Sequence, residues 1–242
     1  MSGHSKWATI KRKKAATDAA RGKVFTKIIK EITISARDGG GDPDANPRLR
    51  LAIQTAKGSN MPQDNITRAI KKGTGELEGV KYEEITYEGY APGGIAMVIE
   101  SVTDNKNRTV AELRHLISKN NGNLGESGSV AWMFDRKGVI SVEKAGVSED
   151  DLMELILEAG ADDLKTEGDF FEVVCSLESF ERTRKAIEDK GYKIESASLQ
   201  YLAKDLLPVD SAKVDEVIRC IEAIEDNDDV QNVFTNADFP DE

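Results

Sequence analysis

Four consecutive basic residues near the N-terminus, 11 to 14, are the part of this sequence best suited to bind a ligand. Lysine offers phosphate oxygens a compact positive charge, arginine offers a planar fork of donors, and an aromatic ring can stack on a base. Lys6 and Trp7 add one more cation and such a ring just before the run, and Trp7 either stacks on a base or, as general aromatic burial favours, anchors this segment to the helical core. These residue types in this order predict a segment that binds the backbone of a nucleic acid.

Charge is distributed unevenly along the 242 residues, which together have a net charge of −11. Residues 1–80 contain sixteen basic and eight acidic residues, a net charge of +8, whereas residues 81–242 contain seventeen and thirty-six, a net charge of −19. An acidic protein that concentrates its positive charge at one end has the electrostatic pattern of a polyanion-binding module. The acidic remainder would repel nucleic acid, so we expect it to orient the basic part, to bind protein or to limit unspecific adhesion.

A second set of basic residues lies at helical spacing. The segment 18–37 repeats apolar residues with the period of an amphipathic helix. The basic residues opposite its apolar stripe are Lys23, Lys27, Lys30 and Arg37. This face is either part of the phosphate-binding surface or the ordinary solvent-facing side of the helix.

Two shorter helices are predicted after a glycine-rich loop. Asn46 caps the first, which runs from Pro47 to about Lys57 with Gly58 as its stop, and the second runs from Pro62 to Gly73. Their basic residues, which could extend the surface, are Arg48, Arg50, Arg68, Lys71 and Lys72. The lysines beside Gly73 also fit simple complementarity to a helix C-terminus. The sequence thus predicts a small, basic, three-helix domain.

Period-2 patterning replaces helical patterning after about residue 78. The expected elements are first a ββαβ unit, with strands at 84–90, 95–102 and 130–134 and a helix at 109–118, and then a βαββαβ unit at 136–197. The tail adds a strand near 199–203, a helix at 211–225 and a strand at 230–234, which the first unit needs to complete its sheet.

The predicted fold is therefore α+β. An N-terminal three-helix basic domain, residues 1–78, precedes two ferredoxin-like α+β domains. The middle domain is discontinuous, combining residues 79–135 with 198–242, and residues 136–197 form the inserted domain. The hydrophobic content of 39% is enough to bury one or more ordinary cores.

Other classes of site find little support in the sequence. No Ser, Cys or His motif indicates a catalytic centre, so we expect no enzyme and no cofactor. His4 and His115 have no partner at metal-ligand spacing, and we expect no metal. Cys175 and Cys220 suit buried positions in a reducing compartment. No apolar run is long enough to span a membrane, so we expect a cytoplasmic protein without membrane partners. The sequence leaves the oligomeric state open, with a monomer favoured.

Four blocks of the sequence resemble, in order, the YebC/PmpR family of regulatory proteins. They are residues 3–14 (GHSKWATIKRKK), 41–50 (GDPDANPRLR), 60–73 (NMPQDNITRAIKKG) and 87–94 (YEGYAPGG). The resemblance is sharpest over residues 1–135. It implies a three-domain α+β protein of the bacterial cytoplasm, with mitochondrial relatives that act as translational activators, and it implies no catalytic residues.

Both functions described for members of this family involve binding to nucleic acid. Members are described as DNA-binding transcriptional regulators and as ribosome-associated translation factors, so the partner is either DNA or ribosomal RNA. Against DNA, no predicted helix shows a clear base-reading set. The residues that we predict to contact nucleic acid are Lys6, Trp7, Lys11, Arg12, Lys13, Lys14, Arg21, Lys23, Lys27, Lys30, Arg37, Arg48, Arg50, Arg68, Lys71 and Lys72.

Overall fold

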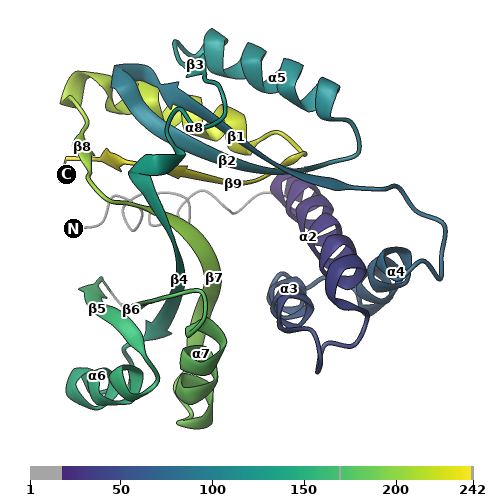
Figure 1. Ribbon diagram of the computed structural model, residues 1–242, viewed down its shortest axis with the longest axis vertical. Coiled ribbons are helices and arrows are strands. Elements are labelled where there is room, and N and C mark those ends of the chain that lie inside the picture. The colour runs from purple at the N-terminus through teal and green to yellow at the C-terminus, as the bar shows by residue number, and fades with distance from the viewer. Residues whose placement is uncertain (1–17, 169, 241–242) are drawn as a thin grey trace.

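The computed structural model describes residues 18–168 and 170–240. Its fold is α+β, as predicted, with three helices followed by two four-stranded antiparallel sheets. Figure 1 shows the three bodies, with the helices on one side, one sheet above and the other below.

The N-terminal body consists of α2 (Asp18–Gly39), α3 (Pro47–Gly58) and α4 (Gln63–Gly73). The predicted cap is confirmed, because the Asn46 side chain accepts a hydrogen bond from the backbone N–H of Leu49 at 3.1 Å. Apolar side chains of all three helices, including Ile32, Leu49 and Ile66, form one buried core. Gly73 lies so close to α2 that a Cβ there would meet the carbonyl oxygen of Thr33 at 2.3 Å. The pattern of apolar residues therefore sets how the helices pack.

The first sheet has the strand order β3-β1-β2-β9. Its central hairpin joins β1 (Glu83–Ala91) to β2 (Ile95–Thr103) through a turn in which Gly93 has a φ of 79°. The outer strands are β3 (Asn123–Leu124) and β9 (Val230–Thr235). Helices α5 (Lys106–Lys119) and α8 (Val214–Glu225) pack against the sheet through a shared apolar core. The return of β9 beside β2 confirms that the tail completes this sheet.

The second sheet has the strand order β5-β6-β4-β7. Its strands are β4 (Phe134–Glu143), β5 (Ala161–Glu167), β6 (Phe170–Cys175) and β7 (Ile194–Ala203). The helices α6 (Glu149–Glu158) and α7 (Phe180–Asp189) lie after β4 and β6 and contribute to one buried core. This βαββαβ order with antiparallel pairing is the doubled split βαβ that the sequence predicts.

Two predicted strands were wrong. Residues 130–134 do not form a strand of the first sheet: Ala131–Met133 is a short 3-10 helix, and Phe134 already begins β4. The carboxylate of Glu88 accepts the backbone N–H groups of Val130 and Ala131, both at 2.7 Å, which removes these donors from any ladder. The third strand of that sheet is instead the short β3.

Residues 199–203, expected as a separate strand of the tail, are the end of β7. The ladder with β4 continues without a break from Ile140 opposite Ala197 to Phe134 opposite Ala203. Both long strands therefore run through the expected boundaries at 135 and 197. The division into three domains stays a prediction.

Minor elements complete the chain. They are a 3-10 turn at Pro92–Gly94, a 3-10 turn at Ser211–Lys213 that leads into α8, and the two-residue strands β8 (Leu207–Pro208) and β10 (Ala237–Asp238), which pair in parallel. Cys175 and Cys220 are free and buried, as predicted. In the part of the chain that the structure describes, no helix is both long and apolar enough to span a bilayer.

Candidate nucleic-acid interface

The predicted contact residues fall into five groups in the structure. Residues of the N-terminal arm, which we define as residues 1–17, lie outside the described residues. These are Lys6, Trp7, Lys11, Arg12, Lys13 and Lys14. Arg21 lies in α2, and only its backbone is described. The remaining nine residues divide according to what their side chains contact.

Lysines of α2 contact the C-terminal end of α8. Lys27 Nζ donates a hydrogen bond to the carbonyl oxygen of Glu225 at 2.6 Å, and Lys23 Nζ donates to that of Asp226 at 3.2 Å. The carboxylate of Asp226 lies 3.5 Å from the Lys23 ammonium group. The last carbonyls of a helix carry partial negative charge, which attracts cations. These two lysines therefore cap a helix from another part of the chain.

Lys30 is held more tightly. Its side chain is buried, and its ammonium group donates to the Asp229 carboxylate at 2.6 Å and to the carbonyl oxygen of Asp228 at 2.8 Å. We call the contact of Lys23, Lys27 and Lys30 with residues 225–229 the clasp. A buried ammonium group is tolerable only when it is paired and hydrogen-bonded, which is the case here. The clasp joins the helical body to the first sheet.

Asp229 is the centre of a hydrogen-bond network. Besides Lys30, its carboxylate accepts from Arg108 at 2.8 Å, from Thr109 at 2.7 Å and from Thr103 at 3.2 Å. Burial would raise the pKa of Asp229, but the hydrogen bonds from Lys30, Arg108 and Thr109 outweigh it and lower the pKa to about 2. The Asp229 carboxylate is thus ionised, and both of its oxygens accept hydrogen bonds from groups of the protein itself.

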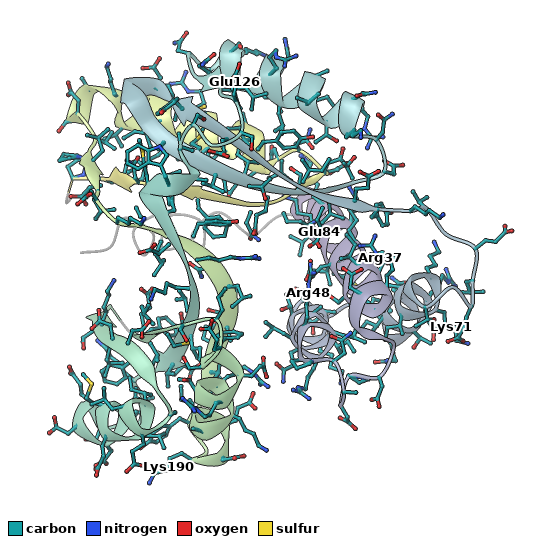
Figure 2. The ribbon with its side chains drawn as sticks, in the orientation of Figure 1. Arg37, Arg48, Lys71, Glu84, Glu126 and Lys190 are labelled. Atoms are coloured by element: carbon teal, nitrogen blue, oxygen red, sulfur yellow. The ribbon has the colours of Figure 1, made fainter. Side chains whose placement is uncertain are left out.

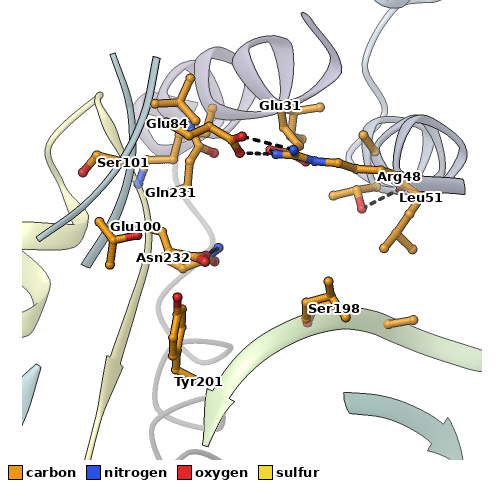
Figure 3. Close-up of a pocket in the computed structure, with 18 of the residues that line it drawn as sticks. Glu31, Arg48, Leu51, Glu84, Glu100, Ser101, Ser198, Tyr201, Gln231 and Asn232 are labelled. Carbon is orange, nitrogen blue, oxygen red and sulfur yellow. Dashed lines mark hydrogen bonds and ion pairs between the residues drawn. The ribbon is translucent and has the colours of Figure 1, made fainter. Parts of the chain in front are cut away.

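The arginines of α2 and α3 also have acidic or carbonyl partners. Arg48 pairs with Glu31 at 2.7 Å and with Glu84, so that it bridges α2 and β1, as Figure 3 shows. Arg37 pairs with Asp38 at 2.7 Å and donates to the backbone carbonyl of Tyr82.

Arg50 reaches in a third direction. It donates to the carbonyl oxygens of Pro43 and Asp44 at 3.1 and 3.3 Å, and it lies 3.5 Å from the Glu181 carboxylate at the start of α7. The three arginines thus hold the helical body to its own loop, to the first sheet and to the second.

Among the predicted contacts whose side chains the structure describes, only the cations of α4 are open. Arg68, Lys71 and Lys72 are exposed, and none of them has an ion pair or side-chain hydrogen bond to another described residue. Their spacing of three and four residues puts them on one face of the helix, opposite the buried Ile66 and Ala69. Figure 2 shows Lys71 on the outer side of the helical body, away from both sheets. Among the predicted contact residues with described side chains, these three are therefore the ones whose charges are available to a ligand.

A large cleft of about 1270 Å³ lies between the three bodies. Its walls come from α2 and α3, from the first sheet, and from β4, β7 and the start of α7, and Figure 3 shows part of them. Seven acidic and four basic side chains line it. An excess of carboxylates disfavours a polyanion, so the cleft is not a continuation of the basic surface.

Glu100 on β2 is one of the acidic residues that line the cleft. Its carboxylate accepts a hydrogen bond from Asn232 at 3.0 Å and lies 3.7 Å from Arg136. Burial raises the pKa of Glu100, and the nearby carboxylates of Glu31 and Glu84 raise it further. Such a carboxylate, facing two others, favours the arrival of a cation.

Comparison with known proteins shows which protein family this chain resembles. Residues 5–76 match a family model described as the TACO1/YebC protein N-terminal domain, and residues 82–237 match one described as the TACO1/YebC second and third domain. The chain belongs to the TACO1/YebC family. The two matches cover both the basic helical body and the two sheets.

Relatives within the TACO1/YebC family are similar along the whole chain. A probable transcriptional regulatory protein from Desulfosudis oleivorans is 57% identical over 241 residues, which cover 100% of this chain and 98% of that protein. One from Chlorobaculum tepidum is 57% identical over 240 residues, covering 99% and 96%. The crystal structure of a conserved hypothetical protein from Aquifex aeolicus is 45% identical, with a TM-score of 0.86 and 95% of each chain covered.

Two features of this TACO1/YebC protein were not predicted from its sequence. The acidic residues at 225–229 have a charge complementary to the lysines of α2, and this could have suggested the clasp. Trp132 is 65% exposed, although its indole N–H donates to the carbonyl oxygen of Ser129 at 3.1 Å.

In the described ranges, 18–168 and 170–240, no group of three or more His, Cys, Asp or Glu side chains could hold a metal ion.

Proposed function

We propose that this TACO1/YebC protein is a non-enzymatic regulator of gene expression that binds DNA through its N-terminal helical body and regulates transcription. The observation that carries the proposal is the open basic face of α4, formed by Arg68, Lys71 and Lys72. The names of its relatives, probable transcriptional regulatory proteins, support transcription as the process.

The geometry of α4 supports contact with a duplex. Helices α3 and α4 are joined by the four residues 59–62, a connection as short as that of a helix-turn-helix unit. Gln63, Thr67, Arg68 and Lys71 fall on the exposed side of α4. Arginine, lysine and glutamine are residue types that donate to base edges, and lysine and arginine also bind phosphates.

The remaining bodies limit where DNA can lie. Residues 81–242 have a net charge of −19. The lysines of α2 that face them are already hydrogen-bonded in the clasp. Like charges repel over about a Debye length, roughly 8 Å at physiological salt. Contact with DNA is therefore confined to the outer side of the helical body and to the arm.

The test is a charge reversal on α4. The variant Arg68→Glu/Lys71→Glu/Lys72→Glu should weaken binding to duplex DNA at least tenfold, and the slope of log K against log salt should fall by about 0.9 for each lost phosphate contact. The matched control is Lys106→Glu/Arg114→Glu/Lys119→Glu on α5, whose three side chains are also exposed. Both variants change the net charge equally, so an equal loss of affinity in both would contradict the proposal.

A second candidate is a translation factor that contacts ribosomal RNA. It is supported by the composition of residues 1–17, which contain five lysines or arginines, no acidic residue and one tryptophan. Cations with an aromatic ring suit the unstacked bases and irregular backbone of RNA.

Crosslinking in cells, followed by sequencing of the recovered DNA and RNA, separates the two candidates. Discrete promoter DNA that is lost in the α4 variant supports the transcriptional regulator. Dominant ribosomal RNA crosslinks beside a featureless DNA signal support the translation factor.

A further inference from the structure

The cleft between the three bodies exposes apolar side chains that nothing in the described chain covers. Val24 on α2, Leu177 before α7 and Leu199 on β7 are 42%, 43% and 37% exposed, and all three line the cleft. Each such side chain gains roughly 25 cal/mol for every Å² of apolar surface removed from water. Three large apolar residues in one concave surface favour an occupant with apolar side chains of its own.

The charge of the cleft specifies the sign of that occupant. Carboxylates outnumber cations seven to four in its lining, and Arg48 already serves both Glu31 and Glu84. Glu100 is left with Arg136 at 3.7 Å and an amide. A segment that combines apolar side chains with several cations is complementary to these walls.

We infer that residues 1–17 of the same chain, the arm, bind in this cleft when the protein is free of nucleic acid. The arm has five cations, no acidic residue, and the apolar residues Trp7 and Ile10. It joins α2 at Asp18, and Lys23 and Val24 line the cleft only about 8 Å further along the helix.

The covalent connection favours this occupant over others. Seventeen residues span about 25 Å as a helix and up to about 55 Å when extended, which is ample for a cleft that begins beside α2. A tethered segment of this length has an effective concentration on the order of millimolar, far above that of a separate molecule. A nucleic acid is disfavoured by the carboxylates.

Binding in the cleft has a consequence that rests on the proposed function. A cation cannot pair with a cleft carboxylate and with a phosphate at the same time. The arm is therefore withheld from nucleic acid in the free protein, and α4 makes the first contacts. Release of the arm follows when phosphates compete for its cations.

The test uses tryptophan fluorescence in the full chain. The sequence has two tryptophans, so the substitution Trp132→Phe leaves Trp7 as the only one. In this background we compare acrylamide quenching of Trp7 in Leu177→Ser/Leu199→Ser with that in Leu157→Ser/Leu207→Ser. The second pair is a matched control, because both leucines are exposed and neither lines the cleft. Circular dichroism checks that each variant is folded.

The expected result is a severalfold rise in the quenching constant for the cleft variant and no change for the control. Trp7 that is equally quenched in the parent and the cleft variant would overturn the inference, whether it is exposed in both or protected in both. Quenching that increases on dilution of the parent would assign the cleft to the arm of a second molecule and would also overturn it.

A DNA titration separates this inference from the proposed function. The cleft variant should bind duplex DNA severalfold more tightly than the control, because its arm is free. If Trp7 becomes accessible but the affinity does not change, the arm binds in the cleft and its competition with nucleic acid is refuted.

Discussion

Helices α2 and α4 belong to the same three-helix body and both carry cations at helical spacing, yet these cations have different surroundings. Those of α2 at positions 23, 27 and 30 contact residues 225–229, whereas those of α4 at 68, 71 and 72 face outward. Lys30 and Asp229 are 199 residues apart in the sequence. A basic face on a helix therefore does not by itself indicate a ligand site, because a distant segment decides whether the face is free.

The difference is one of desolvation. The buried ammonium group of Lys30 contacts the Asp229 carboxylate and a backbone carbonyl in place of water. Such a buried pair holds two bodies in one orientation. The α4 cations keep their water and have no acidic partner among the described residues. Phosphate contact there releases counterions and does not require an internal ion pair to break. One helix thus positions the body and the other is available to a ligand.

The largest effect that separates the two helices is expected on stability. Replacing Lys30 with Met leaves the buried Asp229 carboxylate without its closest cation, and Arg108 alone remains to neutralise it. Removing one partner of a buried pair costs about 3 kcal/mol or more. The free energy of unfolding, measured in urea, should fall by that amount.

Lys71→Met is the control for this substitution. The same side-chain exchange on the open face should change the unfolding free energy by less than about 0.5 kcal/mol. Similar losses in the two variants would show that burial does not distinguish the helices.

An acid titration probes the same pair with a smaller effect. The folded-state pKa of Asp229 is about 2, below the ordinary value of 3.8. A lowered pKa contributes stability above the unfolded pKa and loses it as the pH falls through the folded pKa. The stabilisation, roughly 2 kcal/mol, should therefore be complete at pH 6 and mostly lost by pH 2.

Asp229→Asn isolates this contribution, because it keeps the shape of the side chain but does not titrate. The difference in unfolding free energy between the parent and the variant should shrink as the pH falls from 6 to 2. A difference that stays constant over this range would mean that Asp229 is not the group that titrates.

Much of the fold follows from local patterns. The cap at Asn46, the helix stops at Gly58 and Gly73, and the hairpin before Gly93 are all set by residues within a few positions. The two failures, at 130–134 and 199–203, concern where a strand begins and ends. That depends on cross-strand partners and, for the first, on a Glu88 carboxylate more than forty residues away.

The sequence predicts which residue types form the candidate site, but it does not predict which of these side chains are left open to a ligand. Helical spacing puts Lys30 opposite the apolar stripe expected for α2, and it puts Arg68 and Lys71 on one face of α4. No local pattern shows that Lys30 is covered, because the covering residue follows α8 near the other end of the chain. Because of this sequence separation, charge complementarity could suggest the clasp, but no local pattern predicts which residues pair.

The smallest expected effect lies at the exposed end of the clasp. Lys23 and Asp226 are 46% and 76% exposed, and exposed ion pairs contribute about 0.5 kcal/mol or less. Lys23→Ala should therefore cost no more than that, and the loss should vanish at 1 M salt, where the Debye length is about 3 Å. Because Lys23 and Lys30 lie two turns apart on one helix face, their difference measures what burial adds to the same kind of pair. A loss at Lys23 as large as that at Lys30, and insensitive to salt, would mean that the whole face of α2 is closed to solvent and that no part of it can exchange its carboxylates for phosphates.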